Sequence, residues 1–354
     1  MKRFVLLLFL CWGLCASAAA RPIRGTVKCG GKPLEGITAT DGYSFARSDA
    51  AGEFTLDTND DALFISVVTP SGYIAPTEGG VPQFYRPYVP ATKRYDFCLQ
   101  PWPATGEVYE LLAIADPQPK TETHFERLRT EIIPELQRAA AAGKAQGVQQ
   151  AAILLGDIVG DSPELFTRVK TQFASLGIPV YGVIGNHDHD LKKYTDREAT
   201  ENYRNHFGPT YYAFDRGKIH YVVLDDVFFL ARSYLYAGYL EERQLRWLEQ
   251  DLASVPAGST VVVCLHIPTW SCAARRGEWG KEQTNKVLNN RRALYKLLEP
   301  YRAHILSAHE HYNENYTPVP HVFEHVHAPL STLFWQTPLS MDGIPAGYAV
   351  YEAD

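Results

Sequence analysis

Residues 180–190 read VYGVIGNHDHD, and this stretch decides how the rest of the chain is interpreted. An apolar run ends at Ile184 and is followed directly by Gly185, Asn186, His187 and Asp188. A short apolar run bounded by turn residues predicts a buried strand. The polar residues after it would then lie just beyond the carboxyl end of that strand.

Four further apolar runs end in the same way, at residues 110–115, 151–155, 260–265 and 303–306. Ligands of α/β sheets bind beyond the carboxyl ends of the strands. The side chains that follow these runs would therefore lie together at that edge of the sheet, which we call the rim. The candidate metal ligands collected in this way are Asp116, Gln118, Asp157, Asn186, His266, His309 and His311.

From about residue 107 such runs alternate with helical patterns, which predicts an α/β sheet covered by helices. Thr123 and Glu126 fit a capping box at the start of one helix, which Gly143 would end. Residues 21–102 instead show short strand patterns separated by turn residues, which predicts a small all-β sandwich domain. A proline-rich linker at 101–103 would join the two parts.

Residues 1–20 are predicted to be a secretory signal peptide. Two basic residues precede an apolar segment at 4–14 and small residues at 18–20, and the segment is too short to span a membrane. We therefore expect an exported protein, periplasmic or secreted. Cys11 and Cys15 leave a lipoprotein as the weaker alternative, because each follows a leucine and not a small residue.

The composition is that of a folded protein, with 45% hydrophobic and 21% charged residues. The net charge of −6 gives no sign of a basic surface, so binding to a nucleic acid backbone is not indicated. Outside residues 1–20 the cysteines are Cys29, Cys98, Cys264 and Cys272, which allow three full disulfide pairings. Cys264 lies in an apolar run, where a buried thiol acting as a small hydrophobic residue is expected.

The donor types at the predicted rim favour a pair of divalent ions. Carboxylate, amide and imidazole ligands together suit Zn, Fe or Mn. Two ions about 3.5–4 Å apart could bind two oxygens of a phosphate and hold a bridging hydroxide. Asp157 is the natural bridging carboxylate, since it lies between the two groups of ligands in the chain order.

The ordered set resembles the calcineurin-like metallophosphoesterase superfamily, whose pattern is D-x-H, G-D-x-x-(x)-D, G-N-H-[DE], H and G-H-x-H. The resemblance covers about residues 107–350, and residues 21–102 are similar to the β-sandwich that precedes this domain in a subgroup from Bacteroides-type bacteria. It implies a catalytic domain over 107–354 in which two packed mixed β-sheets are flanked by helices, an αββα sandwich. It also implies hydrolysis of a small phosphomonoester or phosphodiester.

The resemblance also implies a role for each matched residue. His187 would be the general acid that protonates the leaving oxygen, and Asp188 would hold it. The first metal would be bound by Asp116, Gln118, Asp157 and His311, and the second by Asp157, Asn186, His266 and His309.

The sequence departs from the family pattern in three places. Gln118 replaces the usual histidine, so the first metal is expected to bind more loosely or to differ in identity. The residues at 307–308 are Ser and Ala where a glycine precedes the first histidine of the family pattern. Relatives continue into a further C-terminal domain, whereas this sequence stops at Asp354; either the protein lacks that domain or the sequence is a shortened version.

Several alternatives remain open at the level of sequence. Asp161 is interpreted as a helix cap and is left out of the metal set. An exported binding protein with a degenerate metal site and a glycan- or surface-binding sandwich is the second functional hypothesis, motivated by Gln118. Trp270 and Trp335 could stack on a substrate or pack in the core. Residues 321–327 include three histidines with a smaller chance of touching substrate.

Overall fold

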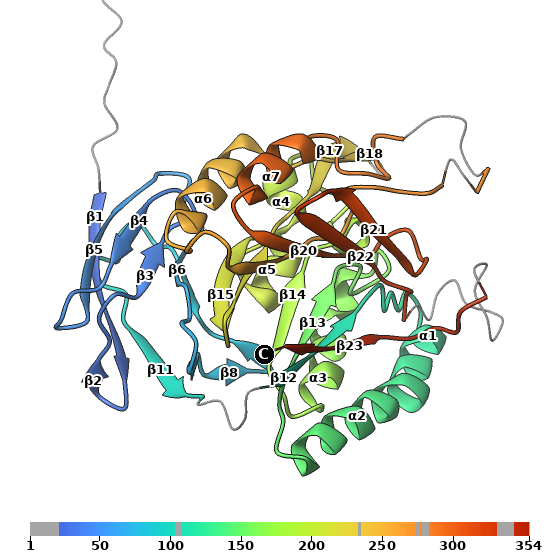
Figure 1. Cartoon of the computed structure of the whole chain (residues 1–354), viewed down its shortest axis with the longest axis horizontal. Helices are drawn as coiled ribbons and strands as arrows, with labels where there is room; N and C mark the ends of the chain where they lie inside the picture. The colour runs from blue at the N-terminus through green and yellow to red at the C-terminus, as the bar shows by residue number, and fades with distance from the viewer. Residues whose placement is uncertain are drawn as a thin grey trace, which may run out of the picture.

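The structure, a computed structural model, describes residues 21–102, 108–232, 235–273, 276–277, 283–330 and 343–353. Figure 1 shows N-terminal strands at the left, two β-sheets through the centre, and helices above and below them. The predicted signal peptide at 1–20 lies outside the described residues. Within the described ranges, no helix has both the length and the apolar character needed to cross a bilayer.

The N-terminal part consists mostly of strands, as the sequence predicts. Residues 53–58 alternate exposed and buried side chains, which is the pattern of a strand with one face on a core. One sheet has the order β2-β1-β11-β7, with β5 also paired to β1, and a second has the order β10-β6-β3-β4. The bounds are β1 (Arg21–Cys29), β2 (Lys32–Pro33), β3 (Thr38–Thr40), β4 (Phe45–Arg47), β5 (Glu53–Thr58), β6 (Phe64–Val67), β7 (Tyr73–Ile74), β8 (Thr77–Glu78), β9 (Val81–Pro82), β10 (Tyr85–Pro87) and β11 (Phe97–Pro101).

Two mixed sheets form the centre of the part that follows residue 108. The first has the order β14-β13-β12-β23, in which only β23 is antiparallel to its neighbour. The second has the order β15-β16-β19-β20-β22-β21, in which β16, β19, β20 and β22 run parallel. The bounds are β12 (Tyr109–Ile114), β13 (Gln149–Leu155), β14 (Val180–Val183), β15 (Tyr212–Arg216), β16 (Ile219–Val223), β19 (Thr260–Cys264), β20 (Arg302–Ser307), β21 (Glu314–Val319), β22 (Val322–Val326) and β23 (Ala349–Ala353).

Helices cover the outer face of each sheet, so the predicted αββα arrangement is confirmed. One apolar cluster packs α1, α2, α3 and α5 on the first sheet, and another packs α6 and α7 on the second. A separate two-stranded hairpin, β17 (Val227–Arg232) and β18 (Leu235–Gly238), lies beyond the second sheet. The helical bounds are α1 (Glu122–Arg127), η1 (Leu128–Ile132), α2 (Ile133–Ala145), η2 (Pro163–Leu165), α3 (Phe166–Ala174), η3 (Asn186–Asp188), α4 (Asp196–Ala199), α5 (Glu201–Phe207), α6 (Glu242–Leu252) and α7 (Arg291–Leu298).

The first long helix differs from its prediction at both ends. Thr121, and not Thr123, caps α1, because its hydroxyl accepts a backbone N–H of the first turn. The π-helical turn η1 then inserts an extra residue between α1 and α2, which shifts the buried face by one residue. Gly143 lies inside α2, which continues to Ala145.

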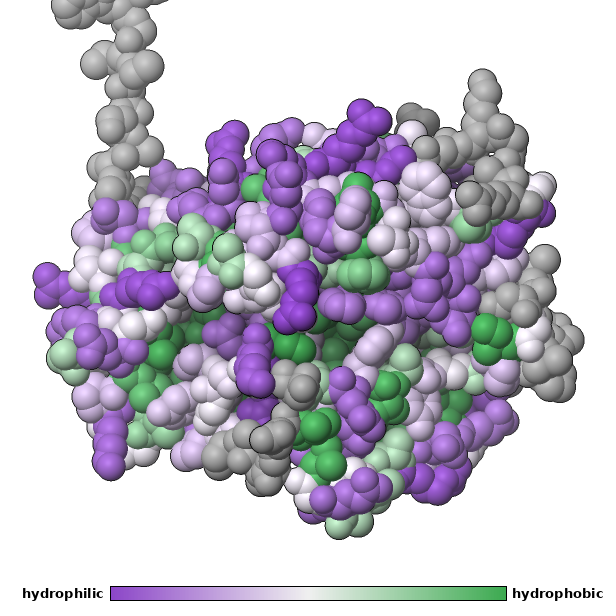
Figure 2. Space-filling model, in the orientation of Figure 1, coloured by the Kyte–Doolittle hydropathy of each residue, from purple (hydrophilic) through white to green (hydrophobic). Residues whose placement is uncertain are grey.

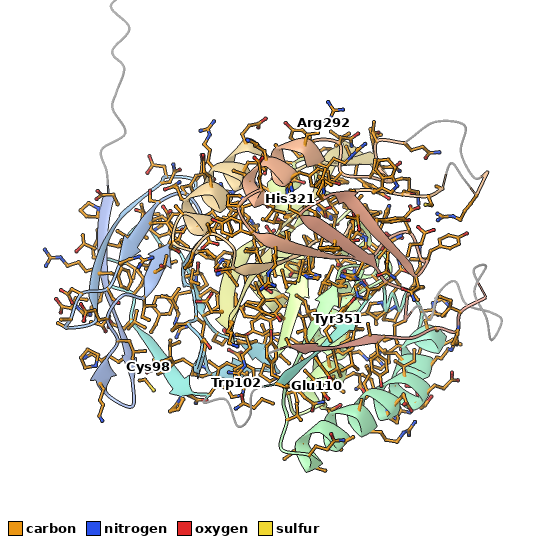
Figure 3. All side chains as sticks on the ribbon, viewed as in Figure 1. Cys98, Trp102, Glu110, Arg292, His321 and Tyr351 are labelled. Carbon is orange, nitrogen blue, oxygen red and sulfur yellow. The ribbon has the colours of Figure 1, made fainter. Side chains whose placement is uncertain are left out.

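The N-terminal strands share one apolar core with the two central sheets. Arg216, at the end of β15, joins the two parts: its guanidinium donates to the Trp102 carbonyl at 2.8 Å and lies 3.8 Å from the indole centroid. Trp102 is labelled in Figure 3, below the sheets. Nearby, the Asp215 N–H donates to the Thr69 carbonyl at 2.8 Å. The N-terminal part is therefore packed against the two central sheets as one unit.

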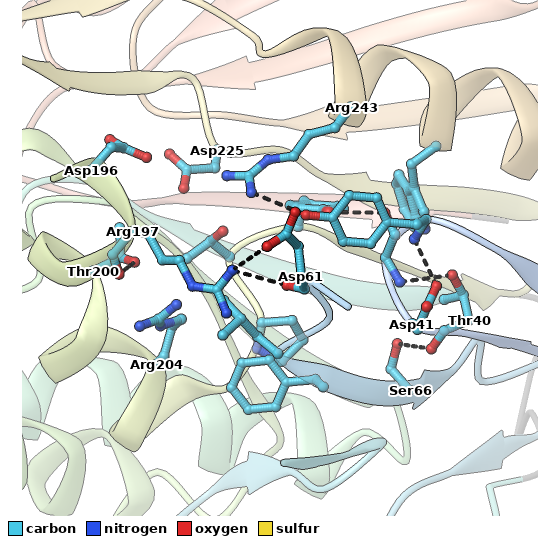
Figure 4. Close-up of a pocket in the computed structure, with 18 residues that line it drawn as sticks. Thr40, Asp41, Asp61, Ser66, Asp196, Arg197, Thr200, Arg204, Asp225 and Arg243 are labelled. Atoms are coloured by element: carbon cyan, nitrogen blue, oxygen red, sulfur yellow. Dashed lines mark hydrogen bonds and ion pairs between the residues drawn. The ribbon is translucent and has the colours of Figure 1, made fainter. Parts of the chain in front are cut away.

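A polar pocket lies where the N-terminal strands meet the rest of the protein (Figure 4). Arg197 donates to the Asp61 carbonyl at 3.1 Å, and Tyr211 donates to the Gly42 carbonyl at 2.9 Å. Arg243 reaches the Tyr43 hydroxyl at 3.3 Å. These bonds tie the N-terminal strands to the segment from α4 to α6.

Figure 2 shows a hollow near the centre of the viewed face, between the two central sheets. The groove there has a volume of about 640 Å³ and a mixed polar and apolar lining that includes Tyr221 and Tyr351, the latter labelled in Figure 3. Thr260 and Arg302, the first residues of β19 and β20, also line it. The groove therefore opens at the amino ends of these strands, opposite the predicted ligand rim.

Candidate metal centre

The carboxyl ends of five parallel strands bring the seven predicted ligands to one rim. Positive φ angles mark the same rim, because every non-glycine residue with this backbone conformation in the described part of the chain lies there. The backbone of a non-glycine residue is strained at a positive φ, and such strain persists only where the surrounding structure enforces it. These residues are Asp116, Gln118, Asp157, Asp161, His309 and His311.

Two glycines allow the loops of the rim to approach one another. A Cβ atom at Gly185 would overlap the backbone nitrogen and Oδ1 of Asp157. A Cβ atom at Gly156, which has a φ of +87°, would overlap the His266 ring. The glycines that precede Asp157 and Asn186 in the sequence are thus required by close packing of the ligands.

Asp157 lies at the centre of the site. Its Oδ1 accepts the His187 backbone N–H at 2.8 Å and lies 3.3 Å from Nε2 of His266. Burial raises the pKa of this carboxyl, but the positive field of His266 and His187 outweighs burial and lowers the pKa below its usual range. Ligand atoms of Asp157, His266 and His309 lie within 4.8 Å of one another, which is close enough for one ion.

His266 is oriented for ligation by its ring contacts. Nδ1 lies 2.9 Å from the Leu155 carbonyl, and as a donor there it leaves Nε2 as the ligand nitrogen. Nε2 lies 3.1 Å from Oδ1 of Asn186, so the predicted second-metal ligands converge. Burial lowers the His266 pKa, but the neighbouring Asp157 carboxylate raises it to about 10. This negative field, which favours a proton, would equally favour a cation.

The loop that carries His309 and His311 also contacts Asp116, whose Oδ2 accepts the His309 backbone N–H at 3.3 Å. Nε2 of His309 lies 3.0 Å from the Asn285 carbonyl, which leaves Nδ1 as the ligand nitrogen. Asp116 is fully buried, and its Oδ1 lies 3.3 Å from Nε2 of His311. That oxygen has no hydrogen-bond partner among the described residues. A buried carboxylate oxygen in this situation is costly unless a cation binds there, so the residues fit a bound metal ion.

Gln118 also points into the site. Its side-chain nitrogen donates to Oδ2 of Asp157 at 2.8 Å, and its backbone N–H donates to the Asp157 carbonyl at 3.0 Å. The amide is 1% exposed, so it occupies the position of a ligand even though it replaces a histidine. Ligation through its oxygen requires the opposite orientation of the amide group.

The partner of His187 differs from the prediction. Nδ1 of His187 lies 2.7 Å from Oδ1 of Asp161, and Oδ2 of Asp161 accepts from Lys120 at 2.9 Å. Asp188 instead accepts the backbone N–H groups of Val159 at 3.0 Å and Gly185 at 2.9 Å. The expected contact of Asp188 with the His187 ring is therefore wrong, and so is the interpretation of Asp161 as only a helix cap.

The charge of His187 follows from this arrangement. Burial lowers its pKa, but the charge of Asp157 and the hydrogen bond to Asp161 together raise it to about 9. A protonated imidazole at neutral pH can donate a proton. Its side chain is 17% exposed, so Nε2 remains accessible while Nδ1 is held.

Buried carboxylates beneath the rim hold the ligand loops, and sequence reasoning missed two of them. Asp226 accepts the backbone N–H groups of His266 and Ile267 at 3.1 Å. Glu324 accepts the Thr269 N–H at 2.7 Å and the Ser307 hydroxyl at 2.9 Å, so it joins the loop after His266 to the strand before His309. Burial raises the pKa of each to about 7. No sequence signal near either residue indicated this role.

Tyr236 on β18 was also missed. Its ring meets the His309 ring edge-on, with centroids 6.0 Å apart. A side-chain hydrogen bond joins its hydroxyl to Asn285, which also binds His309 through its carbonyl. The loop 226–240 had no readable pattern, because its position over the site depends on tertiary packing.

The three histidines at 321–327 bond within the fold. Nε2 of His321 lies 3.0 Å from the Tyr295 carbonyl, and Nδ1 of His325 lies 2.7 Å from Oδ1 of Asn315. His327 is buried, with Nδ1 2.8 Å from the Ser307 carbonyl and Nε2 2.9 Å from the Tyr351 hydroxyl. Trp270 and Trp335 could stack on a substrate or pack in the core. Trp270 is 41% exposed, and Trp335 lies outside the described residues.

The cysteines are all unpaired in the described part of the chain. Cys264 is fully buried in the core shared by the sheets, so its interpretation as a hydrophobic residue is confirmed.

Two family models match the sequence. The model described as "Calcineurin-like phosphoesterase" matches residues 109–313, and the model described as "N terminal of Calcineurin-like phosphoesterase" matches residues 21–102. No curated protein matches the chain.

Solved structures show distant similarity. A dimetal phosphatase from Danio rerio has 16% identity, with 62% of this chain and 87% of that chain covered, at a TM-score of 0.44. A purple acid phosphatase from yellow lupin (Lupinus luteus) seeds has 11% identity, with 87% and 59% covered, at a TM-score of 0.43. A 5'-nucleotidase from Candida albicans has 11% identity, with 62% and 46% covered, at a TM-score of 0.38.

Proposed function

The chain belongs to the calcineurin-like phosphoesterase family and is therefore a phosphoester hydrolase that uses divalent metal; on this premise we propose that it cleaves a small phosphomonoester or phosphodiester at a centre of two ions. The observation that carries the proposal is the convergence of carboxylate, amide and imidazole groups from five strand ends around Asp157. The ligands would be Asp116, Gln118, Asp157, Asn186, His266, His309 and His311.

When bound, the ions would supply an activated water molecule and neutralise charge on the phosphoryl group. The protein would supply the remaining steps. Asp157 would help to hold both ions, since its Oδ1 faces His266 and its Oδ2 faces Gln118. His187 would protonate the leaving oxygen from Nε2, while Asp161 holds Nδ1 and stabilises the charged ring.

The activity assay that tests this proposal uses purified protein loaded in turn with Mn, Fe or Zn. An aryl phosphomonoester and an aryl phosphodiester are the substrates, and metal content is measured on the same samples. Asp157→Asn should lose metal and activity together. His187→Ala should keep metal and lose turnover, and unchanged turnover in that variant would remove its assigned role.

The same assay separates the proposal from the alternative of an exported binding protein. A binding protein would hold metal without turnover, and its His187→Ala variant would behave as the parent does. The His187–Asp161 pair favours the enzyme, because binding alone does not require a positioned acid.

We also propose export, on the sequence of residues 1–20 alone. N-terminal sequencing of the protein recovered from the periplasm or the medium tests it, since cleavage is expected close to residue 20.

A further inference from the structure

The hairpin β17–β18 places a pair of aromatic side chains against the metal-ligand loops. Phe229 and Tyr236 are cross-strand partners, so their side chains point to the same face of the hairpin. The Phe229 ring stacks on His189 with centroids 5.9 Å apart, and the Tyr236 ring meets His309 edge-on at 6.0 Å. This face of the hairpin therefore covers the site from the His187 loop to the His309 loop.

Backbone bonds fix the hairpin in this position. The Phe229 N–H donates to Oδ1 of Asp196 at 2.8 Å on one strand. On the other strand, the Gly238 N–H donates to the Thr284 carbonyl at 2.8 Å and its carbonyl accepts from Asn289 at 2.8 Å. These bonds fix the position of Tyr236 and do not involve its own hydroxyl.

The hydroxyl of Tyr236 faces the ligands and is held by Asn285. A side-chain hydrogen bond joins the phenol to the Asn285 amide, which can donate through its nitrogen. The carboxylates of Asp157 and Asp161, on the loop after β13, and of Glu310, on the loop after β20, all act on the same phenol. When the Asn285 amide nitrogen donates in this bond, the phenol keeps its own proton and can donate it toward the space above the ligands.

A phosphomonoester needs such a donor. Its phosphoryl group has three terminal oxygens, and a pair of ions would bind two of them. The third oxygen carries charge and gains from a neutral or positive hydrogen-bond donor. A phosphodiester has only two terminal oxygens, so it has no third one for the protein to bind.

We propose that Tyr236 donates a hydrogen bond to the third terminal oxygen of the substrate, and that the substrate class is therefore the phosphomonoester. This inference rests on the proposed function, because it assumes two ions at the rim. Tyr236 is then a substrate-binding residue, and Asn285 is the positioning residue that orients both its hydroxyl and His309.

The test compares Tyr236→Phe with Tyr239→Phe. Both remove one hydroxyl and keep the ring, but the Tyr239 hydroxyl is bound to Glu242 at 2.7 Å on the exposed side of the same segment. Metal content is measured first and should be equal in the parent and both variants. Calorimetry of metal-loaded protein then gives the dissociation constant of inorganic phosphate, and kcat/KM is measured for 4-nitrophenyl phosphate and bis(4-nitrophenyl) phosphate.

For Tyr236→Phe we expect about 10- to 100-fold weaker phosphate binding, the usual effect of losing a hydrogen bond to a charged group. The kcat/KM for the monoester should fall by a similar factor, and that for the diester should stay within about twofold because no third oxygen is involved. Tyr239→Phe should match the parent. Asn285→Ala keeps the carbonyl that binds His309, and it should weaken phosphate binding less than Tyr236→Phe does.

Unchanged phosphate binding in Tyr236→Phe would overturn the inference while leaving the hydrolase intact. An equal fall for both esters would also overturn it, because the residue would then shape the site without selecting monoesters. If the metal-loaded parent neither binds phosphate nor cleaves either ester, the proposed function itself fails, and the inference fails with it.

Discussion

Nδ1 of His187 lies 2.7 Å from Oδ1 of Asp161, and Oδ2 of the same carboxylate lies 2.9 Å from the Lys120 ammonium. The three side chains come from three loops, so the partner of His187 is set by tertiary packing. The carboxylate both orients the ring and stabilises its positive charge, which are the two properties that a proton donor requires.

Asp161→Asn should therefore impair turnover without removing metal. We expect kcat to fall by about 100-fold or more, because a positioned general acid contributes about 10²–10⁴-fold. Steady-state kinetics with metal analysis measures this. Lys120→Met is the matched control, and its effect should be much smaller because the Lys120 side chain is 41% exposed. A parent-like kcat in Asp161→Asn would contradict the role of this pair.

Gly185→Ala should abolish metal binding. The added Cβ would overlap Asp157 at its backbone nitrogen and Oδ1, so the bridging carboxylate could not keep its position. Gly347→Ala is the control, since a Cβ there meets its nearest atom, the Pro345 carbonyl oxygen, at an ordinary 3.7 Å. Metal content after dialysis measures the difference. Full occupancy in Gly185→Ala would show that the loops can separate without losing the site.

Glu324→Ala should weaken both the fold and the centre. The Thr269 N–H and the Ser307 hydroxyl would lose their acceptor in a buried place, and the free energy of unfolding should fall by about 3 kcal/mol. Metal affinity should fall by about 10- to 100-fold, as for other groups that orient ligand loops. Glu324→Gln should do less, because its amide oxygen still accepts from Thr269. Urea denaturation of the metal-free protein and metal titration measure the two effects; equal behaviour of the two variants would argue against the role of the acceptor.

His220 should make stability depend on pH. Its ring lies 2.7 Å from both Asp215 and Asp251; burial lowers its pKa, but the two carboxylates raise it to about 9, above the unfolded value of about 6.5. A pKa raised in the folded state stabilises the fold fully below the unfolded pKa and loses its effect as pH rises through the folded pKa. We expect His220 to contribute on the order of 2 kcal/mol at pH 6 and almost nothing at pH 10.

The measurement is urea denaturation of the parent and His220→Gln between pH 6 and pH 10. The difference in unfolding free energy between the two proteins should shrink as the pH rises. A constant difference across this range would mean that the ring acts by packing and not by its charge.

The predicted ligand set could be read from the sequence because each of its parts is local. An apolar run that ends in Gly156-Asp157 or Gly185-Asn186 indicates a buried strand and the polar group that follows it. Parallel strands place such groups at one rim of the sheet. The alternation of strands and helices gave the sheet class for the same reason. The bounds of the first helix could not be read as well, because the π turn at 128–132 depends on packing.

The sequence by itself determined which side chains follow which strands, and hence the family, the layered sheets and the donors available at the rim. Only the tertiary structure decided which of those donors meet. Asp188 is adjacent to His187 in the chain, but the short turn at 186–188 directs its carboxylate back to Gly185, and Asp161 takes its place. Glu324 and Tyr236 approach the site from distant strands, and such contacts depend on how elements pack, which no local pattern encodes.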